Sequence, residues 1–600
     1  MTDQSPALRL IEQGASGLAP HLQESGELND PVFGEPTQYG TAYFAYVNGT
    51  LSVLGDPASR PGRRGAARAG LAATLRHLAD PADPSPAADF THDVGSPGSR
   101  NLRDFMWPPA LRALRLLRQA DGAEAGDLDA LARKVAVPEV FSERAPVNWA
   151  AVWIAGELLR IQDGLSPHPD AALDQWLEGF FADGAHSDHG FYRELRLTTG
   201  SPVTWRRAID VAAGLYQEPG VPNSYDLWTR LHLMDLLYSG YQGAYRAELE
   251  RLAVTGLRRS LDIQLSSGSL PSAYRGSGHL WNLAGQLSLF FHGARVVEGQ
   301  DPGLAEEARS AALRAFAAAQ ACLRPAGDLS PIENVHPASA RMGYEAHTMD
   351  AHYVSLPLGF LCNAVLNGFT GAGQPRERPD GGRAEGDPVH RSVVHAGGWS
   401  VHLNLNPQEG YDAFGIADVT LGVGRRLRFG GQTHYGRSDA HPDEHFLTHQ
   451  TPVTLGIAAW GDGRQVRPLS AMRPAAAPEA RYRPGHLEAA ATLGEFPYRI
   501  SVDIDGDVAL IVEGAGVQRC SLLVPYLYDR GDGVRTDVTI EGGAVELRSG
   551  DETVAVVVNG PVERAVHLTS SYESRYGLCG LVRLDLAEPG PVTYELRRQR

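Results

Sequence analysis

The chain has 600 residues, of which 43% are hydrophobic and 21% charged, and its formal net charge at pH 7 is −17. This length exceeds one ordinary hydrophobic core, so we expect a soluble protein of two to four domains. The acidic balance argues against general nucleic-acid binding, which needs a basic face. No run of eighteen or more apolar residues occurs, so we expect no transmembrane helix and no membrane partner.

The N-terminus, MTDQSPALRLIEQGASG, lacks a basic start followed by an apolar run. It therefore shows no secretory signal, and we expect a cytoplasmic protein, or a secreted one if a signal has been removed. Cys322, Cys362, Cys520 and Cys579 are widely separated and form no CxxC pair. We expect them to be small buried residues rather than a disulfide framework or a zinc site.

The first 370 residues are helical in character, because apolar residues recur there at the spacing of a helix face. Turns rich in Gly, Pro and Asp separate these segments, and no strand-like segment intervenes. This order excludes parallel βαβ folds, and the lack of a strict repeat weakens tetratricopeptide and HEAT interpretations. An array of helical hairpins remains, either an open solenoid or a closed toroid. The predicted helices cover residues 67–80, 109–121, 148–164, 172–184, 224–240, 280–299, 304–323 and 352–369.

A change of pattern follows the helical region. Residues 371–389 are rich in Gly, Pro and charge, which is typical of a linker. From residue 390 to residue 600 the apolar period becomes two, with Gly and Asp turns every eight to twelve residues. Such a pattern predicts antiparallel sheets stacked as a sandwich. We therefore expect an α+β multidomain chain, with a helical domain at 1–370, a linker at 371–389 and a β-sandwich domain at 390–600.

Polar clusters lie at the starts of several predicted helices. Asn148 and Trp149 open the helix in APVNWAAVWIAGELL, where asparagine is either a helix cap or an amide donor aimed into a cleft. The turn HSDHGFYRE carries His189, Tyr192 and Glu194, and is either solvated loop or part of the same cleft.

The segment VPNSYDLWTRLH places Tyr225 and Trp228 in the first turns of an apolar helix, either as interfacial core residues or as cleft residues. In PSAYRGSGHLWN, a Gly-Ser turn brings together Arg275, His279 and, at the helix start, Trp281 and Asn282. An arginine in such a turn is a common way to bind a carboxylate, although a structural loop anchor is the alternative.

The longest polar segment is ENVHPASARMGYEAHTMDAHYVSL, with His336, Arg341, Tyr344 and His347. It connects two apolar helices over a greater length than ordinary helix connections need. His347 and His352 do not have the i, i+4 spacing of a helical zinc pair, and no HExxH motif occurs. We therefore expect no metal here.

These clusters occupy helix starts and connecting loops, and in a toroid such ends gather at one mouth. Aromatic rings with amide, imidazole, guanidinium and phenol groups suit a sugar chain that carries carboxylates. In the β region, RFGGQTHYGRSDAHPDEHFLTH places His434 and Tyr435 in a loop after a strand, where they could close the groove.

The order of features resembles the toroid-plus-β-sandwich polysaccharide lyases, the broad group that includes hyaluronate/chondroitin, alginate and heparinase II/III-type lyases. The layout matches over nearly the whole chain. NWAAVWIAGELL is similar to the helix with the family's catalytic asparagine, HGFYRELR and PNSYDLW to the segment with its histidine and tyrosine, and AYRGSGH to its arginine turn. The sequence departs from the family in the long spacing from His189 to Tyr225 and in the lack of an NNH motif.

The resemblance implies an N-terminal (α/α) toroid and a C-terminal antiparallel β-sandwich. It implies a lyase that cleaves uronate-containing polysaccharides or oligosaccharides by β-elimination, without a cofactor, so the expected partner is an acidic glycan. Tyr225 would exchange protons, while Asn, Arg and His side chains neutralise the substrate carboxylate. The catalytic set would be Asn148, Tyr225, Arg275, His279 and His189. The substrate-binding set would be Trp149, Tyr192, Trp228, Trp281, Asn282, His336, Arg341, Tyr344, His347, His434 and Tyr435.

Two alternatives stay open. An (α/α)-toroid glycoside hydrolase or phosphorylase would need two carboxylates about 6.5–9.5 Å apart if it inverts. Glu345 and Asp350 are the candidates, with Asp226 or Glu194 behind them. A glycan-binding protein without catalytic activity is the second alternative.

Overall fold

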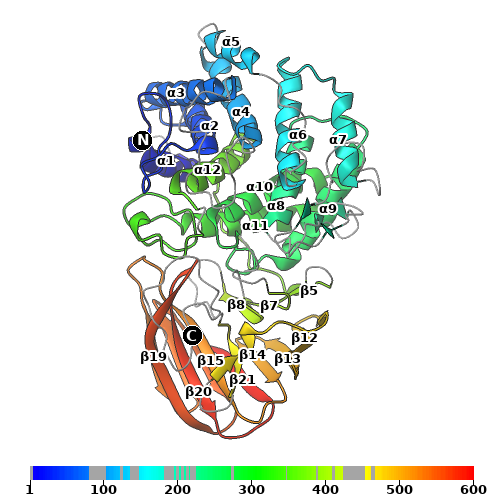
Figure 1. Cartoon of the computed structure of the whole chain (residues 1–600), viewed down its shortest axis with the longest axis vertical. Coiled ribbons are helices and arrows are strands. Elements are labelled where there is room, and N and C mark those ends of the chain that lie inside the picture. Colours follow the sequence, from blue (N-terminus) through cyan, green and yellow to red (C-terminus); the bar gives the residue numbers. More distant parts are fainter. Residues whose placement is uncertain are drawn as a thin grey trace.

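The computed structural model describes most of the chain and separates it into a helical half and a β half (Figure 1). In the described part the long helices end at Leu366 and the large sheets begin at Gly381. Two short β-hairpins lie between helices α7 and α8. The predicted α+β layout is therefore confirmed. The described residues are 4–79, 103–121, 126–135, 147–181, 195–196, 202–203, 209–210, 215–216, 224–271, 276–345, 348–386, 390–407, 413–422, 453–460 and 466–599.

Six helices form a closed ring in which each packs against the next, and the last packs against the first. They alternate along the sequence with six outer helices, so the chain builds a toroid of helical hairpins rather than an open solenoid. The inner helices are α2 (Gln38–Leu54), α4 (Arg103–Asp121), α6 (Val147–Gln162), α8 (Ser224–Tyr238), α10 (Leu280–Val297) and α12 (Asp350–Leu366).

The outer helices pack on the outside of this ring, for example α3 on α2 and α11 on α10. The inner helices are buried nearly all round, which explains why their apolar pattern is broad, whereas α9 and α11 keep an exposed face. The outer helices are α1 (Pro6–Leu18), α3 (Arg60–Ala79), α5 (Gly126–Lys134), α7 (Ala171–Phe181), α9 (Arg246–Ile263) and α11 (Pro302–Gln320).

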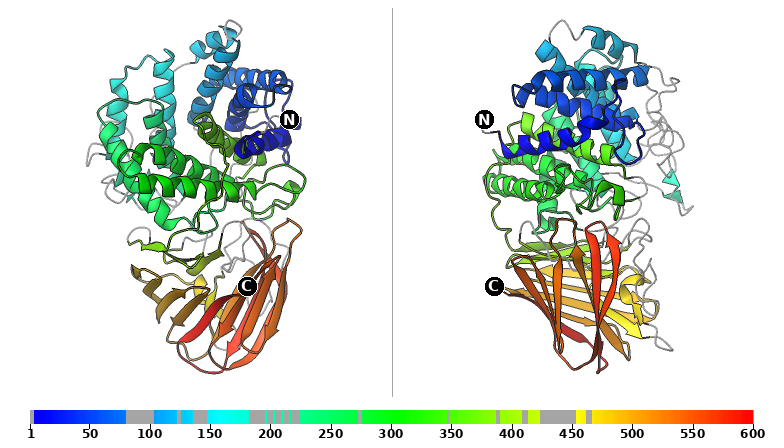
Figure 2. Two further views of the ribbon diagram at one scale, coloured as in Figure 1. Left: turned by 180° about the vertical axis from the view of Figure 1, so that it is seen from behind. Right: turned by 90° about the vertical axis from the view of Figure 1, so that its left-hand side faces the viewer.

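The β half contains three antiparallel sheets, and the side view in Figure 2 shows them stacked beneath the helices. A four-stranded sheet lies next to the toroid and contacts α9. Five-stranded and eight-stranded sheets form the sandwich, and all three sheets contribute to one hydrophobic core. The four-stranded sheet consists of β5 (Gly381–Ala384), β6 (Arg391–Ala396), β7 (Trp399–Asn404) and β8 (Gly415–Leu421).

The two sandwich sheets follow the predicted alternation of strands and short turns. The five-stranded sheet has the order β10 (Val466–Pro468), β9 (Gly456–Trp460), β15 (Cys520–Asp529), β20 (Gly577–Leu586) and β19 (Val562–Ser574). The eight-stranded sheet has the order β11 (Glu479–Arg483), β12 (His486–Leu493), β13 (Phe496–Asp505), β14 (Val508–Gly514), β21 (Val592–Gln599), β18 (Glu552–Val558), β17 (Ala544–Ser549) and β16 (Thr536–Glu541).

Strands β6, β7 and β8 are buried on both faces, because the toroid covers one face and the sandwich the other. Strand β5 lies inside the segment that the sequence predicts as a linker. The sequence did not indicate a strand here, because these residues are rich in Gly and Arg. In the structure they pair with β6 and pack on α9 and do not form a core of their own.

Two further expectations can be compared with the structure. The four cysteines are buried and free of disulfides, as expected. Within the described ranges, no helix combines the length and the apolar character that spanning a membrane requires.

Candidate active site

Aromatic rings from the first turns of five inner helices touch one another at one end of the toroid, which we call the mouth. Tyr39 of α2 stacks on His352 of α12 with ring centroids 4.1 Å apart, and its ring lies 5.5 Å from that of Phe105 of α4. Phe105 stacks on Trp228 of α8 at 5.3 Å, and Trp228 meets Trp281 of α10 edge to face at 5.4 Å. These contacts join the starts of alternate helices, as the sequence predicts for a toroid.

This aromatic layer is the floor of the mouth rather than an open platform. All five rings are at most 8% exposed, and Trp228 and Trp281 are each 5% exposed. The two tryptophans, expected to bind substrate, therefore support the mouth from below.

Tyr225 lies in the first turn of α8, three residues before Trp228 of the floor. It is half-buried, whereas Ser224 before it and Asp226 after it are buried. The otherwise buried start of this helix thus keeps one phenol ring partly accessible at the mouth. Neither Tyr39 nor Phe105 of the floor was singled out from the sequence, although each lies in the first turn of an apolar helix.

Asp226 holds the start of α8 in place through two buried arginines. Arg230 donates to both carboxylate oxygens at 3.0 and 2.9 Å, and Nη1 of Arg259 donates to Oδ2 at 2.6 Å. Arg259 also donates to Glu385, which follows β5, at 2.6 Å. Burial alone would raise the pKa of the Glu385 carboxyl, but the charges of Arg259 and Arg391 hold it at about 2. This chain of charges ties the helix that carries Tyr225 to the β half.

The backbone N–H and carbonyl of Gly276, the residue after Arg275, are held by three side chains. The Gly276 N–H donates to Glu345 Oε1 at 2.7 Å, and the Gly276 carbonyl accepts from Asn282 and from Nδ1 of His279. Gly276 has φ +78°, and a Cβ there would lie 3.4 Å from the Trp281 ring. Glycine therefore lets this loop approach the mouth closely.

His279 occupies a supporting position in this loop. Its ring is fully buried, with Nδ1 at 3.0 Å from the Gly276 carbonyl and Nε2 at 2.9 Å from Thr348 Oγ1. Both ring nitrogens are therefore already bound to protein. His279 therefore orients the loop and has no direct access to substrate. This position differs from the predicted catalytic role. Asn282 is likewise 2% exposed and acts on the Gly276 carbonyl.

The β half reaches this loop through the turn between β19 and β20. Arg575 in that turn is fully buried, and its guanidinium lies 3.5 Å from Glu345 Oε1. Its carbonyl accepts from both the backbone and the side-chain amide of Asn334, at 3.1 and 3.2 Å. A Cβ on Gly278 would lie 3.1 Å from Arg575 Cβ, so the turn presses closely against the loop. No pattern in the sequence pointed to Arg575, which is 230 residues from Glu345 along the chain.

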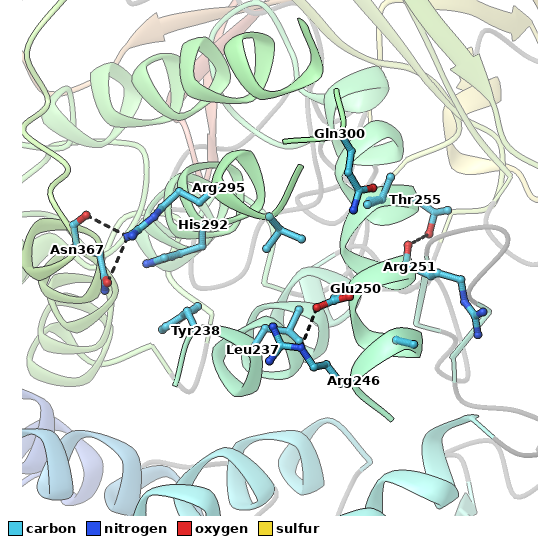
Figure 3. A pocket seen from close by; sticks show the side chains of 13 residues that line it. Leu237, Tyr238, Arg246, Glu250, Arg251, Thr255, His292, Arg295, Gln300 and Asn367 are labelled. Carbon is cyan, nitrogen blue, oxygen red and sulfur yellow. Dashed lines mark hydrogen bonds and ion pairs between the residues drawn. The ribbon is translucent and has the colours of Figure 1, made fainter. Parts of the chain in front are cut away.

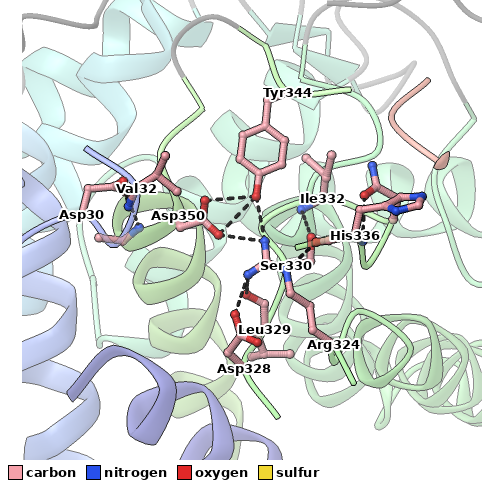
Figure 4. A network of polar contacts seen from close by, with 12 residues as sticks. Asp30, Val32, Arg324, Asp328, Leu329, Ser330, Ile332, His336, Tyr344 and Asp350 are labelled. Atoms are coloured by element: carbon pink, nitrogen blue, oxygen red, sulfur yellow. Dashed lines mark hydrogen bonds and ion pairs between the residues drawn. The ribbon is translucent and has the colours of Figure 1, made fainter. Parts of the chain in front are cut away.

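A second buried network lies at the start of α12 (Figure 4). Arg324 donates to the Tyr344 hydroxyl at 2.7 Å and to Asp350 Oδ1 at 2.8 Å, and the hydroxyl is 3.0 Å from Asp350 Oδ2. Burial, together with the Asp350 charge, raises the pKa of Tyr344 far above its ordinary value. Tyr344 is therefore a buried structural residue and not part of an open binding surface.

Two predicted binding residues on the same segment keep partial exposure. His336 turns toward the β half, with Nε2 3.2 Å from the Asp529 carbonyl. The Arg341 guanidinium lies over the rings of Phe33 and Tyr344, at 4.6 and 5.0 Å from their centroids. Of the predicted site residues with described side chains, Tyr225, His336 and Arg341 are the ones that are not buried.

Other predicted site residues have no described side chain. Asn148 and Trp149 lie in the first turn of α6, which begins at Val147, so Asn148 is inside the helix rather than at its cap. The remaining residues lie outside the described ranges: His189, Tyr192, Arg275, His347, His434 and Tyr435.

The floor also contains buried polar atoms without a hydrogen bond. Ser224 Oγ, Asn282 Oδ1 and both ring nitrogens of His232 have no hydrogen-bond partner among the described residues, and neither Ser224 nor His232 was singled out from the sequence. Burial lowers the pKa of His232 to about 4, so its imidazole is neutral near pH 7. Among the described residues, no group of three or more His, Cys, Asp or Glu side chains is arranged to hold a metal ion.

Comparison with solved structures identifies the architecture. Over its full length the chain resembles chondroitin AC lyase from Streptomyces coelicolor A3, solved in complex with chondroitin sulphate, with a TM-score of 0.51 and 12% identity over 80% of that protein. The chain has the fold of the toroid-plus-β-sandwich polysaccharide lyases. No family model and no curated protein matches its sequence.

More distant similarities extend to other toroids. The heparan sulfate lyase HepC from Pedobacter heparinus matches 90% of each chain at 9% identity, with a TM-score of 0.35. The GH76A α-1,6-mannanase from Salegentibacter sp. HEL1_6 matches 60% of this chain and 99% of its own at 12% identity, with a TM-score of 0.36. The predicted resemblance to the lyase group is confirmed at the level of the fold.

Proposed function

We propose that the protein is a lyase that cleaves a uronate-containing polysaccharide or oligosaccharide by β-elimination, with Tyr225 as its proton-transfer group. The observation that carries this proposal is the position of Tyr225. It is the half-buried residue of an otherwise buried first turn of α8, and the same helix contributes Trp228 to the floor where five inner helices meet. The substrate would be an acidic glycan that lies across the mouth.

The chemistry requires one proton to leave carbon and one to reach oxygen. A base removes the proton at C5 of the uronate, the electron pair forms the C4=C5 double bond, and the C4–O bond breaks. The departing glycosidic oxygen then takes a proton. A phenol such as Tyr225 can perform both transfers in turn, because both atoms lie on the same side of a bound sugar.

The C5 proton becomes acidic enough only when the neighbouring carboxylate is neutralised. Asn148, at the start of α6, and Arg275, directly before Gly276, are the proposed donors. Glu345, Asn282 and His279 hold the backbone of Gly276, and so they would limit the movement of Arg275. His189 is retained as a further proposed donor.

Among the described residues, the carboxylates considered for a hydrolase favour the lyase; the remaining candidate, Glu194, lies outside the described ranges. Asp226 is bound by Arg230 and Arg259, and Asp350 is bound by Arg324 and Tyr344, each with 2% exposure. An inverting hydrolase needs two carboxyl groups that flank the scissile bond with room for a water molecule. Neither of these aspartates meets that need, and the Glu345 carboxylate is fully buried beneath the loop.

One experiment separates the candidates. A panel of uronate-containing glycans is incubated with the protein while ultraviolet absorbance and product masses are recorded. A lyase gives a conjugated unsaturated uronate that absorbs and a product mass without added water. A hydrolase gives reducing ends, one water added per cleavage and no such absorbance, which would overturn the proposal. A binding protein gives neither change.

A further inference from the structure

A cavity lies at the end of the toroid where the inner helices finish, opposite the mouth where they begin. Figure 3 shows the side chains that line it. Its volume is about 1110 Å³, and it is formed by the last turns of α8 and α10, the first half of α9 and the residue that follows α12. Helix α8 has 15 residues, so its rise alone separates this cavity from Tyr225 by roughly 20 Å. The cavity is therefore separate from the proposed active site.

The described lining is positive although the protein as a whole is acidic. It contains Arg246, Arg251 and Arg295 against one acidic residue, Glu250. Arg246 pairs with Glu250 at 2.9 Å, and Arg251 pairs with Glu248 at 2.8 Å. Figure 3 shows Arg295 on the α10 wall and Arg246 on the α9 wall, with Arg251 directed away from both.

Arg295 is the cation of this lining that pairs with no carboxylate in the described structure. It donates only to Asn367, to the carbonyl at 3.3 Å and to Oδ1 at 3.4 Å, both near the upper limit for a hydrogen bond. Such weak contacts let the guanidinium turn to an anionic ligand. A carboxylate would accept two parallel bonds from it, which is the strong geometry for this pair.

The rest of the lining suits a ligand rich in hydroxyl groups. Tyr238 stacks on His292 at 4.0 Å and forms a flat aromatic wall. His292 Nδ1 lies 2.8 Å from the Ser288 carbonyl, and Nε2 is buried without a hydrogen-bond partner among the described residues. Burial lowers the pKa of His292 to about 4, so the ring is uncharged at neutral pH. The wall also includes Thr255, Gln300 and Asn367 as polar groups, and Leu237, Val254 and Val296 as apolar ones.

We infer that this cavity is a second, non-catalytic binding site for a small acidic oligosaccharide, with its carboxylate between Arg295 and Arg246. The volume is slightly above that of ordinary ligand pockets, which is roughly 300–1,000 Å³, and so leaves room for an oligosaccharide. The choice of an acidic glycan as ligand rests on the proposed function, but the cavity contains none of the residues at the mouth. It would hold a segment of substrate or a released product away from the reacting bond.

The test is calorimetric titration with a chondroitin tetrasaccharide in the Tyr225→Phe background, which prevents turnover. We expect two binding sites per chain. Arg295→Met should weaken one of them about tenfold or more, as expected for loss of a charge-assisted pair, and Arg246→Met with Arg295→Met should abolish it. Arg309→Met is the matched control, since Arg309 pairs with Glu298 on the outer surface and lies outside the cavity lining. Thermal melting confirms that each variant folds.

Two further binding measurements test whether the cavity recognises the carboxylate of the sugar. The carboxyl-reduced tetrasaccharide should bind at the cavity at least tenfold more weakly, and millimolar inorganic sulfate should not displace the acidic form. Equal binding of the reduced sugar, or displacement by sulfate, would overturn the assignment, as would two unchanged sites in the Arg295→Met, Arg246→Met variant. If the mouth binds no tetrasaccharide, the proposed function fails. A single site that is lost in Arg295→Met would still support the cavity as a binding site.

Discussion

Arg259 lies 2.6 Å from Asp226, the residue next to Tyr225, and the same guanidinium donates to Glu385 in the β half. All three side chains are buried. The start of helix α8 is therefore positioned by the β half as well as by the toroid. Stability and the geometry of the mouth should respond together when this arginine is removed.

Arg259→Met should lower the free energy of unfolding by about 3–5 kcal/mol, because it leaves two buried carboxylates without their shared partner. Denaturant titration measures the loss. Arg258→Met is the control, since Arg258 forms an exposed pair with Asp301 and should change stability by less than ~0.5 kcal/mol. Equal effects of the two variants would show that the buried chain of charges does not hold the domains together.

Tyr225→Phe should keep the fold and lower turnover by a factor of at least ~100, because the ring still packs while the proton-transfer hydroxyl is lost. Affinity for substrate should change little. Initial rates of ultraviolet absorbance increase measure the effect, beside binding measured by titration. Near-native elimination by this variant would remove Tyr225 from the mechanism, and Tyr192, Tyr344 and Tyr435 would then be tested.

Tyr344→Phe should behave in the opposite way. Its hydroxyl lies between Arg324 and Asp350 inside the protein, so its removal should cost about 1–3 kcal/mol of stability. Turnover per folded molecule should stay within about twofold of the unmodified protein. Melting temperature and elimination rate, measured on the same preparation, distinguish this structural role. A large fall in rate without a fall in stability would instead place Tyr344 in the chemistry.

Glu513 should make the sandwich less stable as pH rises. This carboxyl is buried between the two large sheets, where it accepts from Ile457 N–H at 3.2 Å and from the Tyr594 hydroxyl at 3.3 Å. Burial raises its pKa to about 7 from an ordinary value of 4.5. The folded state therefore binds the proton more tightly than the unfolded state. The resulting stabilisation is complete below about pH 4.5 and is lost as pH rises to about 7.

Glu513→Gln should remove this dependence, which amounts to a loss on the order of 3 kcal/mol in the unmodified protein. Urea unfolding at pH 5.5 and pH 8 measures the difference for each protein. Glu541→Gln, at an exposed position of the same sheet, should retain the dependence of the unmodified protein. A pH dependence that persists unchanged in Glu513→Gln would assign it to other groups.

The sequence predicts the fold well where apolar periodicity is strong. Helices α8, α10 and α12 match their predicted segments closely, and the β-strands after residue 390 confirm the predicted period of two. Helices α1, α2, α5 and α9 were not predicted, since α2 carries mixed small, polar and aromatic residues and α9 has several charged ones. Their helical state depends on packing against neighbours rather than on a clear pattern of their own.

The site was predictable only in part. Tyr225 was singled out because a phenol in the first turn of an apolar helix is unusual, and the structure leaves it partly exposed. The burial of Trp228, His279 and Tyr344 was not predictable, because it depends on which rings and loops the closed toroid brings together. Arg575 could not be connected to Glu345 at all, since nothing in a hairpin turn indicates which distant loop it will contact.

The turn that carries Arg575 has a consequence for how this protein can be divided. Because Arg575 supports Glu345, and Glu345 fixes the peptide after Arg275, part of the mouth is built by a strand connection near the C-terminus. The helical half expressed alone would keep its toroid sequence but lack this support. A chimera with a sandwich from another protein of this fold would therefore inherit a different mouth, so the two halves must be exchanged, evolved or redesigned together.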